Sequence, residues 1–265
     1  MLQEIMNLPP LLAASIIVLS IVLLSLSSYG ITRKLLGHGA DSERRELAGS
    51  VIFRVSALHG LVLALVFAQE VVNLRDVTTV SSREAALVGD VFYDLKRYDA
   101  EGTLPIREDL ASYTRHVLET EWGALADENT LHDPAWAEWE SAYEAILDLE
   151  PETLRQESLR SIMLGGIRDV SMLRLEREEA ARAGVNPLFL TAAIVGVVLT
   201  AAAYFTFEPT RLNILLLTIF SSYTGLIIFF IIAFANPYHS PGKAAPVSFE
   251  LLYQGEVREL AERAR

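Results

Sequence analysis

Four long apolar runs constrain this chain more than any other feature. The first, Leu8–Ile31, carries no charged side chain and exceeds the roughly 20 residues that cross a bilayer as an α-helix. A cleaved signal peptide would begin with basic residues and have a shorter apolar core, whereas the residues before this run include Glu4 but no lysine or arginine. The first run therefore predicts a transmembrane helix.

The second run, Val51–Ala68, contains Arg54 and His59 and continues into a polar stretch that reaches Asp99. Because no proline interrupts residues 51–99, we expect a single helix of about 49 residues, which is about 73 Å long at helical rise. This length greatly exceeds the thickness of a bilayer. The helix is therefore expected to leave the membrane without a break.

The last two runs, Pro187–Phe207 and Leu212–Ala235, are separated by only four residues and predict a transmembrane hairpin. Between the second and third runs lie three helical segments that each open with proline, whose missing amide costs least in a first turn: Pro105–Leu125, Pro134–Leu149 and Pro151–Arg182. No period-two apolar pattern of useful length occurs there, so we expect an antiparallel helical bundle without strands.

These segments predict an all-α membrane protein with four transmembrane helices per subunit and a helical insert between spans two and three. An apolar fraction of 51% and a mean hydropathy of +0.31 lie above the usual soluble range and agree with this fold class. The expected domains are a first transmembrane pair in residues 1–70 (spans at about 8–31 and 51–70), an acidic helical extramembrane domain in 71–185, a second transmembrane pair in 186–235, and a C-terminal loop and short helix in 236–265.

The acidic excess of the chain is confined to its middle. Residues 71–185 hold 12 basic and 24 acidic side chains, whereas the rest of the chain holds 10 of each. Residues 101–150 alone carry 2 basic and 13 acidic side chains. Such a surface repels a nucleic-acid backbone and attracts cations or basic partners, so we expect no nucleic-acid ligand.

No arrangement of residues in the sequence indicates an enzyme. The chain has no cysteine, hence no disulfide, thiolate metal site or cysteine nucleophile, and it has no glycine-rich phosphate loop, nucleophile elbow or His-x-x-x-His pair. Carboxylate pairs such as Glu119 with Glu121 are expected on a solvated acidic face. The five histidines are widely separated along the chain: His38, His59, His116, His132 and His239. We therefore expect no catalysis, no metal site and no cofactor.

The second span is the candidate wall of a pore, because it is the least apolar span and extends furthest beyond the bilayer. At steps of three or four residues, polar and apolar side chains fall along one helical stripe: Ser56, His59, Leu63, Phe67, Glu70 and Leu74. In a ring of such helices this stripe would form a polar mouth, an apolar constriction that gates by dewetting and an acidic collar that selects cations.

The same residues have structural alternatives. Leu63 and Phe67 can pack against other spans, and His59 can form a hydrogen bond inside one subunit. Glu70 lies near the membrane edge and can pair with Arg75 as surface ions do. The stripe therefore leaves both interpretations open, pore lining and internal packing.

Two other features of the second span also have two interpretations. The long side chain of Arg54 can reach the interface while its stem stays in apolar surroundings, or it can attract anions to the mouth of a pathway. Gly60, Ala64 and Ala68 recur every four residues, a spacing that permits close contact between helices. This spacing indicates packing rather than chemistry.

The fourth run is followed by a segment rich in turn residues, FANPYHSPGKAAPVSFE at Phe234–Glu250, which we call the exit segment. Pro237 cannot continue the helix comfortably, and Asn236 before it favours extended geometry, so the chain must turn there. One interpretation is that residues 238–250 dock against the base of the long second helix and transmit changes between insert and pore. The alternative is an ordinary helix stop with Tyr238 at the membrane interface.

The order of these elements resembles the bestrophin-like domain family, and the resemblance covers nearly the whole chain. Three stretches carry it: LVLALVFAQEVVNLRDVTTVSSREAALVGDVF at the end of span two, TLP at Thr103–Pro105, and Asn236-Pro237-Tyr238 followed by PVSFE. Bestrophins have four spans per subunit, a helical cytosolic part between spans two and three, and a ring of subunits whose second spans line an axial pore. The resemblance therefore implies self-association, with a pentamer favoured.

The resemblance also concerns the exit segment. Bestrophins place an Asn-Pro-Phe motif just after span four, followed by acidic residues that bind calcium. Asn236, Pro237 and Tyr238 match the motif in kind, but HSPGKAAPVS stands in place of the acidic run. Calcium gating by that route is not expected here.

The side of the membrane that holds the insert is contested. Arg33, Lys34, Arg44 and Arg45 in the short first loop favour a cytoplasmic first loop. Basic side chains at the other face pull the insert and the C-terminus to the cytoplasm instead: Arg75, Arg83, Arg174, Arg177, Arg182, Lys243 and Arg258. Long loops weigh less in this rule, so the count slightly favours an outside insert, whereas the resemblance implies a cytosolic one.

The sequence thus leads to two functional hypotheses. The first is a homo-oligomeric, multi-pass ion channel of the cell membrane with span two around the axis, in contact with membrane lipids and inorganic ions and leaning slightly to cations over chloride because of Glu70 and the acidic insert. The second is a non-conducting, membrane-anchored helical scaffold or sensor that recruits a basic partner.

Overall fold

The computed structural model describes residues 2–37 and 42–264. Of the residues singled out above, His38 lies outside this part. All regular elements of the described residues are helical, and four helical stretches are long and apolar enough to cross a membrane: Pro10–Leu36, Arg45–Tyr98, Leu154–Thr206 and Arg211–Phe234. The predicted all-α fold with four apolar spans and a helical insert is confirmed.

The chain groups into two compact units, and the long helix α3, Ser42–Tyr98, contributes to both. The span unit runs to Val72 and includes Gly184–Ala235 and Ser240–Gly242. The insert unit contains Asn73–Ala183, Asn236–His239 and the chain from Lys243 onward. The domain boundaries expected from the sequence stay predictions.

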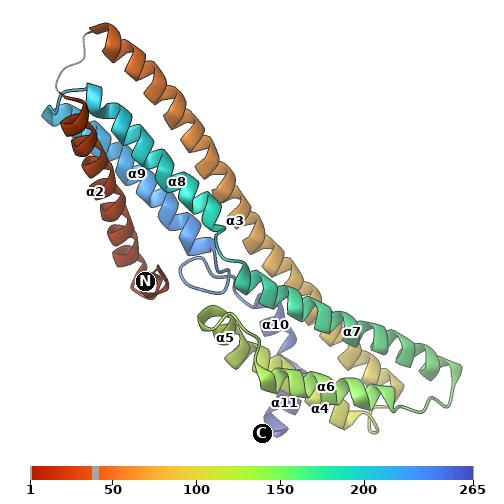
Figure 1. Cartoon of the computed structure of the whole chain (residues 1–265). Coiled ribbons are helices and arrows are strands. Elements are labelled where there is room, and N and C mark those ends of the chain that lie inside the picture. The colour runs from red at the N-terminus through yellow and green to blue at the C-terminus, as the bar shows by residue number, and fades with distance from the viewer. Residues whose placement is uncertain (1, 38–41, 265) are drawn as a thin grey trace. The chain divides into compact units, whose positions relative to one another are not determined.

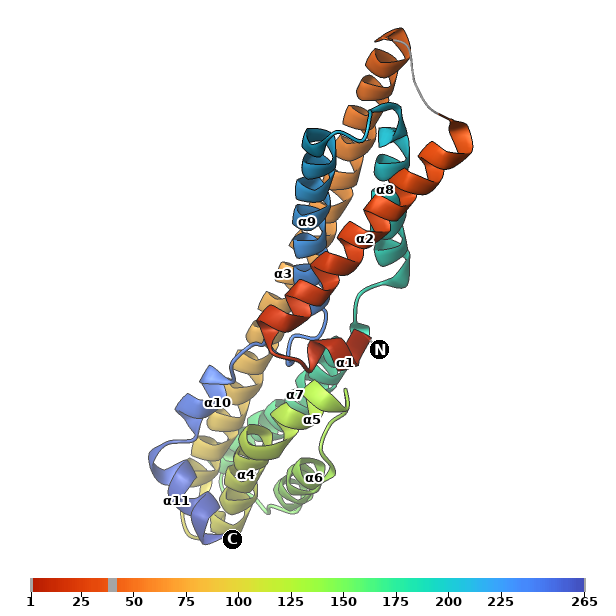
Figure 2. The same ribbon diagram turned by 90° about the vertical axis from the view of Figure 1, so that its left-hand side faces the viewer.

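The span unit is built from α1, α2, the first part of α3, α8, η2 and α9. The bounds of the elements that lie wholly within it are α1 Leu2–Met6, α2 Pro10–Leu36, α8 Pro187–Ala203, η2 Tyr204–Thr206 and α9 Arg211–Phe234. Proline stands in the first turn of α2 and of α8. Side-chain oxygens of Asn186 and Thr210 cap α8 and α9 by accepting backbone N–H groups. Figures 1 and 2 show α2 beside α8 and α9.

Close packing in the span unit depends on a glycine between two helices and on hydrogen bonds at the helix ends. A side chain at Gly225 of α9 would meet the backbone of Val18 of α2 at 2.9 Å, so glycine allows these two helices to approach. At the other end of α2, Tyr29 Oη donates to the carbonyl of Phe207 at 2.9 Å. Arg33 Nη1 donates to the same carbonyl at 2.9 Å, which satisfies backbone acceptors that the helix end leaves free.

The insert unit contains the rest of α3 and the helices of the middle and the C-terminus. Their bounds are α4 Leu104–His116, η1 Val117–Glu121, α5 Trp122–Asp127, α6 Asp133–Leu147, α7 Leu154–Ala183, α10 Val247–Leu252 and α11 Gly255–Arg263. Helix α4 packs between α6 and α11. The helices expected in the insert are present.

Helix α3 has 57 residues, which is about 85 Å at helical rise, so the predicted unbroken helix is confirmed. Within the insert unit its buried face repeats every three or four residues, as a packed helix requires: Val77, Ser81, Glu84, Val88, Val91 and Leu95. Helix α7 has a similar buried stripe: Met163, Ile167, Val170, Arg174, Arg177 and Ala181. The two helices touch at Gly166, where an added Cβ would lie 3.0 Å from Val91.

Candidate functional site

The six stripe residues predicted to line a pore lie on one side of α3, and the chain itself covers most of them. His59, Leu63 and Glu70 are only 6%, 6% and 5% exposed. Ser56, Phe67 and Leu74 are partly buried. Leu63 belongs to the apolar core of the span unit, and Leu74 packs against the core of the insert unit.

His59 fits into a notch on α8. An added Cβ at Gly196 would overlap its imidazole, with Nδ1, Cγ and Cε1 all within 3.0 Å. Phe67, further along the stripe, meets two rings of α9, with its centroid 6.5 Å from that of Phe230 and 5.9 Å from that of Phe234. The stripe thus packs onto α8 and α9 of the same chain, and its role as a pore lining stays a prediction.

The opposite side of α3 is left uncovered by the chain. Leu61, Leu65 and Val72 are 57%, 63% and 46% exposed, and at 3.6 residues per turn they point about 180° away from the side that holds His59 and Leu63. The small residues Gly60, Ala64 and Ala68 are exposed as well. Most of this uncovered face is apolar, but it also carries Arg54, which is exposed and lies 18 residues, or five full turns, before Val72 on the same side.

The exit segment begins with a dense set of hydrogen bonds around Asn236. Its Nδ2 donates to the carbonyls of Leu125 and Ala126, each at 3.2 Å, and to Asn129 Oδ1 at 3.0 Å. Its Oδ1 accepts from the backbone N–H of Tyr238 at 2.8 Å. Asn236 therefore closes the turn at Pro237 and also satisfies carbonyls at the C-terminal end of α5.

The rest of the exit segment docks within the insert unit. Tyr238 is 2% exposed, with its ring edge-on to Trp122 at 5.0 Å between centroids. Trp122 Nε1 donates to the carbonyl of Ala244 at 3.1 Å, and Ser248 meets Ser82 of α3 at 2.8 Å between hydroxyl oxygens. The segment thus contacts α5 and α3. Whether it transmits changes stays a prediction.

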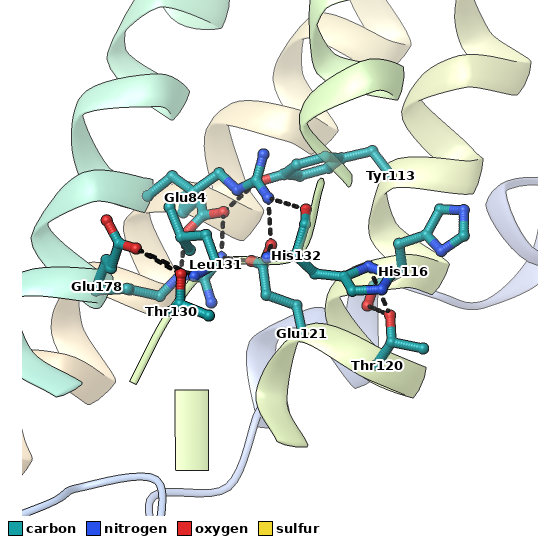
Figure 3. A network of polar contacts seen from close by, with 11 residues as sticks. Glu84, Tyr113, His116, Thr120, Glu121, Thr130, Leu131, His132 and Glu178 are labelled. Atoms are coloured by element: carbon teal, nitrogen blue, oxygen red, sulfur yellow. Dashed lines mark hydrogen bonds and ion pairs between the residues drawn. The ribbon is translucent and has the colours of Figure 1, made fainter. Parts of the chain in front are cut away.

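Four fully buried charges lie at the centre of the insert unit: Glu84 of α3, Glu121 of η1, and Arg174 and Arg177 of α7. We call them the ion cluster (Figure 3). Arg177 donates from Nε to Glu84 Oε2 at 2.5 Å, and from Nη2 to Glu84 Oε1 at 2.9 Å and Glu121 Oε1 at 2.7 Å. Arg174 Nη2 donates to Glu121 Oε2, and Tyr113 Oη donates to Glu84 Oε1. The two positive and two negative charges balance.

Aromatic rings surround the two guanidinium groups. Arg174 lies over Trp136, with Cζ 4.2 Å from the ring centroid, and Arg177 lies over Trp122 at 5.6 Å and Phe249 at 5.7 Å. Cation–π attraction is strongest where water is excluded. Through Phe249 and Tyr238 the exit segment therefore reaches the ion cluster.

The charges of the cluster hold the Glu121 carboxylate ionised. Burial by itself raises the pKa of this carboxyl, but Arg177 and Arg174 outweigh burial and lower the pKa below its usual 4.5. Because the pKa is lowered in the folded state, the stabilisation is present above about pH 4.5 and is lost as the pH falls through the lowered value. Burial also raises the pKa of Tyr238, so the phenol stays neutral.

A π-helical turn brings Glu121 to the cluster. Tyr113, Val117, Glu121 and Leu125 are all 0% exposed although they are spaced four residues apart. In an α-helix each four-residue step advances about 40° beyond a full turn, so the last of these side chains would rotate out of the core. The wider turn of η1, Val117–Glu121, takes up that excess.

The sequence interpretation missed the ion cluster and was wrong about Glu121. We expected Glu121 beside Glu119 on a solvated face, and only Glu119 is exposed there. Arg174 and Arg177 were counted as loop charges, yet they are fully buried. Their signal was present in the sequence, since Glu84, Arg174 and Arg177 stand at inward positions of regular three- and four-residue stripes. No set of three or more histidine or acidic side chains in the described part of the chain could hold a metal ion.

The sequence and the fold of this chain are similar to those of known proteins. A family model described as the Bestrophin-like domain matches residues 19–246. Two solved mutant structures of a bacterial bestrophin homologue from Klebsiella pneumoniae are similar, with TM-scores of 0.65 and 0.64 at 11% and 12% identity, covering 93% and 94% of this chain and 98% of theirs. A third structure, described only as a membrane protein, has a TM-score of 0.65 at 12% identity, covering 95% of this chain and 98% of its own. No curated protein matches significantly in sequence.

Proposed function

The chain belongs to the bestrophin-like domain family, and on that premise we propose that it is a homo-oligomeric ion channel of the cell membrane in which copies of α3 surround a passage. The observation that carries the proposal is the uncovered face of α3. A 57-residue helix presents a largely apolar side that its own chain does not cover and that also carries the exposed Arg54, and its opposite side is used for internal packing. Resemblance alone favours five copies.

The uncovered face is the better candidate for the lining of the passage. A side chain that lines a passage between copies has to be uncovered in a single copy, and Leu61 and Leu65 meet this condition. The stripe that contains His59, Leu63 and Phe67 could line a passage only if it separated from α8 and α9 in the assembled state. Gly60 has no heavy atom within 4 Å of an added Cβ, which leaves room for another helix to approach.

The acidic surface of the insert supports a lean towards cations. Residues 101–150 contain two basic side chains, Arg107 and Arg115, and both are buried, at 3% and 7% exposed. The solvent-facing surface of this stretch is therefore more acidic than its composition alone indicates. Such a surface raises the local concentration of cations.

The same observation favours the second candidate, a membrane-anchored scaffold that recruits a basic partner. An acidic surface attracts a basic protein as well as inorganic cations. Under both candidates we propose a multi-pass protein in contact with membrane lipids, with neither enzymatic activity nor nucleic acid as a ligand. Ion flux separates the two.

Cysteine accessibility tests the channel proposal, because the natural chain has no cysteine. Single variants Leu65→Cys and Leu63→Cys place neighbouring thiols on opposite sides of α3. After reconstitution in liposomes, a water-soluble thiol reagent should block ion flux through Leu65→Cys and leave Leu63→Cys unaffected. The wild-type chain is the control for non-specific effects of the reagent.

Other outcomes would overturn parts of the proposal. Modification of Leu63→Cys with block of flux would place the predicted stripe at the passage instead, and Phe67→Ala would then raise flux. A change in ion selectivity in Glu70→Gln would assign Glu70 to the acidic collar of the passage. Absence of flux in the wild-type chain at every ionic composition would favour the scaffold.

A further inference from the structure

Two histidines face each other beside the ion cluster. His116 is the last residue of α4, and His132 directly precedes α6. Their ring centroids are 6.0 Å apart. Thr120 contacts both residues, because its hydroxyl donates to the carbonyl of His116 at 2.8 Å and lies 3.2 Å from His132 Nδ1 (Figure 3).

The hydrogen bond with Thr120 determines which ring nitrogen of neutral His132 carries the proton. Because the hydroxyl proton of Thr120 is already donated to His116, the hydroxyl oxygen accepts from His132, which places the proton of the neutral ring on Nδ1. Protonation at Nε2 leaves this bond in place. A proton on His132 therefore acts on its surroundings through charge and not through loss of the bond.

The backbone of His132 is hydrogen-bonded to two members of the ion cluster. Its N–H donates to Glu121 Oε2 at 3.3 Å, and its carbonyl accepts from Arg174 Nη2 at 3.1 Å. The two preceding residues are held by α7, since Thr130 Oγ1 and the Leu131 N–H donate to Glu178 Oε1 at 3.1 and 3.2 Å. The α5–α6 loop, residues 128–132, is thus tied to the cluster.

The same loop holds the exit segment. Asn236 Nδ2 donates to Asn129 Oδ1 at 3.0 Å, and Arg182 Nε donates to the carbonyl of Asn129 at 3.2 Å. Asn129 has a positive φ of 55°, a conformation that asparagine tolerates better than most residues. A shift of the loop therefore acts directly on the turn that follows span four.

Charged groups from two elements face His116. Its own helical stretch contributes Arg115, Glu119 and Glu121, and α6 contributes Glu138, whose Oε1 lies 3.8 Å from His116 Nε2. Burial lowers the pKa of His116, and Arg115 and His132 lower it further, whereas Glu119 and Glu121 act in the opposite direction. The neutral ring is thus the form that the closed loop favours.

We propose that His116 and His132 form a proton-binding site that loosens the α5–α6 loop, and with it the docking of Asn236, when both rings become charged. Two like charges at the observed separation repel each other, and because His132 lies on the α5–α6 loop, the repulsion acts on that loop. The effect on ion flux rests on the proposed channel function, whereas the effect on the loop does not.

The sign of the pH dependence follows from the lowered pKa. We call the loop closed when it is docked as in the structure and open when it is not. A histidine whose pKa is below its usual 6.5 in the closed state binds fewer protons there than in the open state. The closed loop is therefore fully favoured above about pH 6.5 and is progressively lost as the pH falls below that value.

Hydrogen exchange of the full chain in detergent tests the site. Amides of the α5–α6 loop, corrected for intrinsic exchange, should lose protection by at least about threefold between about pH 8 and pH 5.5, the factor expected for two unit charges about 6 Å apart in water-like surroundings. In His116→Gln protection should stay unchanged over this range, and in His132→Asn, where burial and Arg115 still lower the pKa of His116, the loss should be smaller than in the wild-type chain. His239→Gln removes a histidine outside the pair and should keep the wild-type response.

Equal loss of protection in all variants, or no loss in the wild-type chain, would overturn the proposal. Ion flux provides a second readout. If the channel function holds, flux should change over the same pH range and the change should vanish in His116→Gln. Absence of flux at every pH would count against the channel, while the exchange experiment would still decide the proton site.

Discussion

Helix α3 buries one continuous stripe in both units, but the two units accommodate the polar members of this stripe in different ways. In the span unit the stripe presents His59 and Leu63 to α8 and the neighbouring core, and a notch at Gly196 receives the imidazole. In the insert unit the stripe contributes Glu84 to the ion cluster, where Arg177 and Tyr113 donate hydrogen bonds to its carboxylate. At these positions the span unit accommodates His59 by shape, and the insert unit accommodates Glu84 by compensating charge.

The difference follows from the cost of burying charge. A carboxylate taken out of water needs a partner and several hydrogen bonds, because the loss of solvation otherwise exceeds any gain. The imidazole of His59 needs space, which the glycine on the facing helix provides. The comparison therefore predicts that the ion cluster of the insert unit is sensitive to charge and the notch at Gly196 in the span unit to volume.

The largest effect is expected from Arg177→Met. This change leaves Glu84 buried without its two guanidinium contacts and should lower the free energy of unfolding of the insert unit by about 3–5 kcal/mol. Denaturant unfolding followed by tryptophan fluorescence measures it, because Trp122, Trp136 and Trp139 are the only tryptophans and all lie in the insert unit.

A double variant is the control for this prediction. Glu84→Gln combined with Arg177→Met removes the uncompensated charge and should recover a large part of the loss. A loss below about 1 kcal/mol in Arg177→Met alone would be of the size of an ordinary surface pair. Such a result would contradict the claim that the insert unit depends on compensated charge.

An intermediate effect is expected from Gly196→Ala in the span unit. The added methyl group overlaps the His59 ring, and overpacking of this kind costs about 1–3 kcal/mol. Thermal loss of helical circular dichroism in detergent measures the change. In the His59→Ala background the cost should largely disappear, and additive losses would show that the notch does not couple the two residues.

Much of the fold followed from the sequence because hydropathy and proline positions report directly on helices. Residues 10–31 of the uncharged run lie in the single helix α2, and residues 51–98 of the proline-free stretch lie in the single helix α3. The pore lining was harder to assign, because periodicity identifies a stripe without saying what the stripe faces. His59, Leu63 and Glu70 form a regular stripe, and in this chain they are buried.

The ion cluster escaped prediction for a different reason. Charges are usually solvated, so Glu121, Arg174 and Arg177 were assigned to surfaces, although the two arginines continue the apolar stripe of α7. Placing Glu121 also requires the π-turn of η1, which no local propensity indicates. Partners more than 50 residues apart along the chain, such as Glu121 and Arg174, become neighbours only through tertiary packing.

The smallest effect is expected from Arg97→Ala, which provides the matched comparison for Arg177. Both arginines lie in the insert unit and pair with carboxylates, but the side chain of Arg97 is 59% exposed where it meets Asp94 at 2.6 Å. Water already solvates the guanidinium group of Arg97, so removal of the arginine should change the free energy of unfolding by less than about 0.5 kcal/mol. The same fluorescence assay applies. If Arg97→Ala costs as much as Arg177→Met, then pairing alone stabilises the unit, and the burial of the ion cluster is not what distinguishes it.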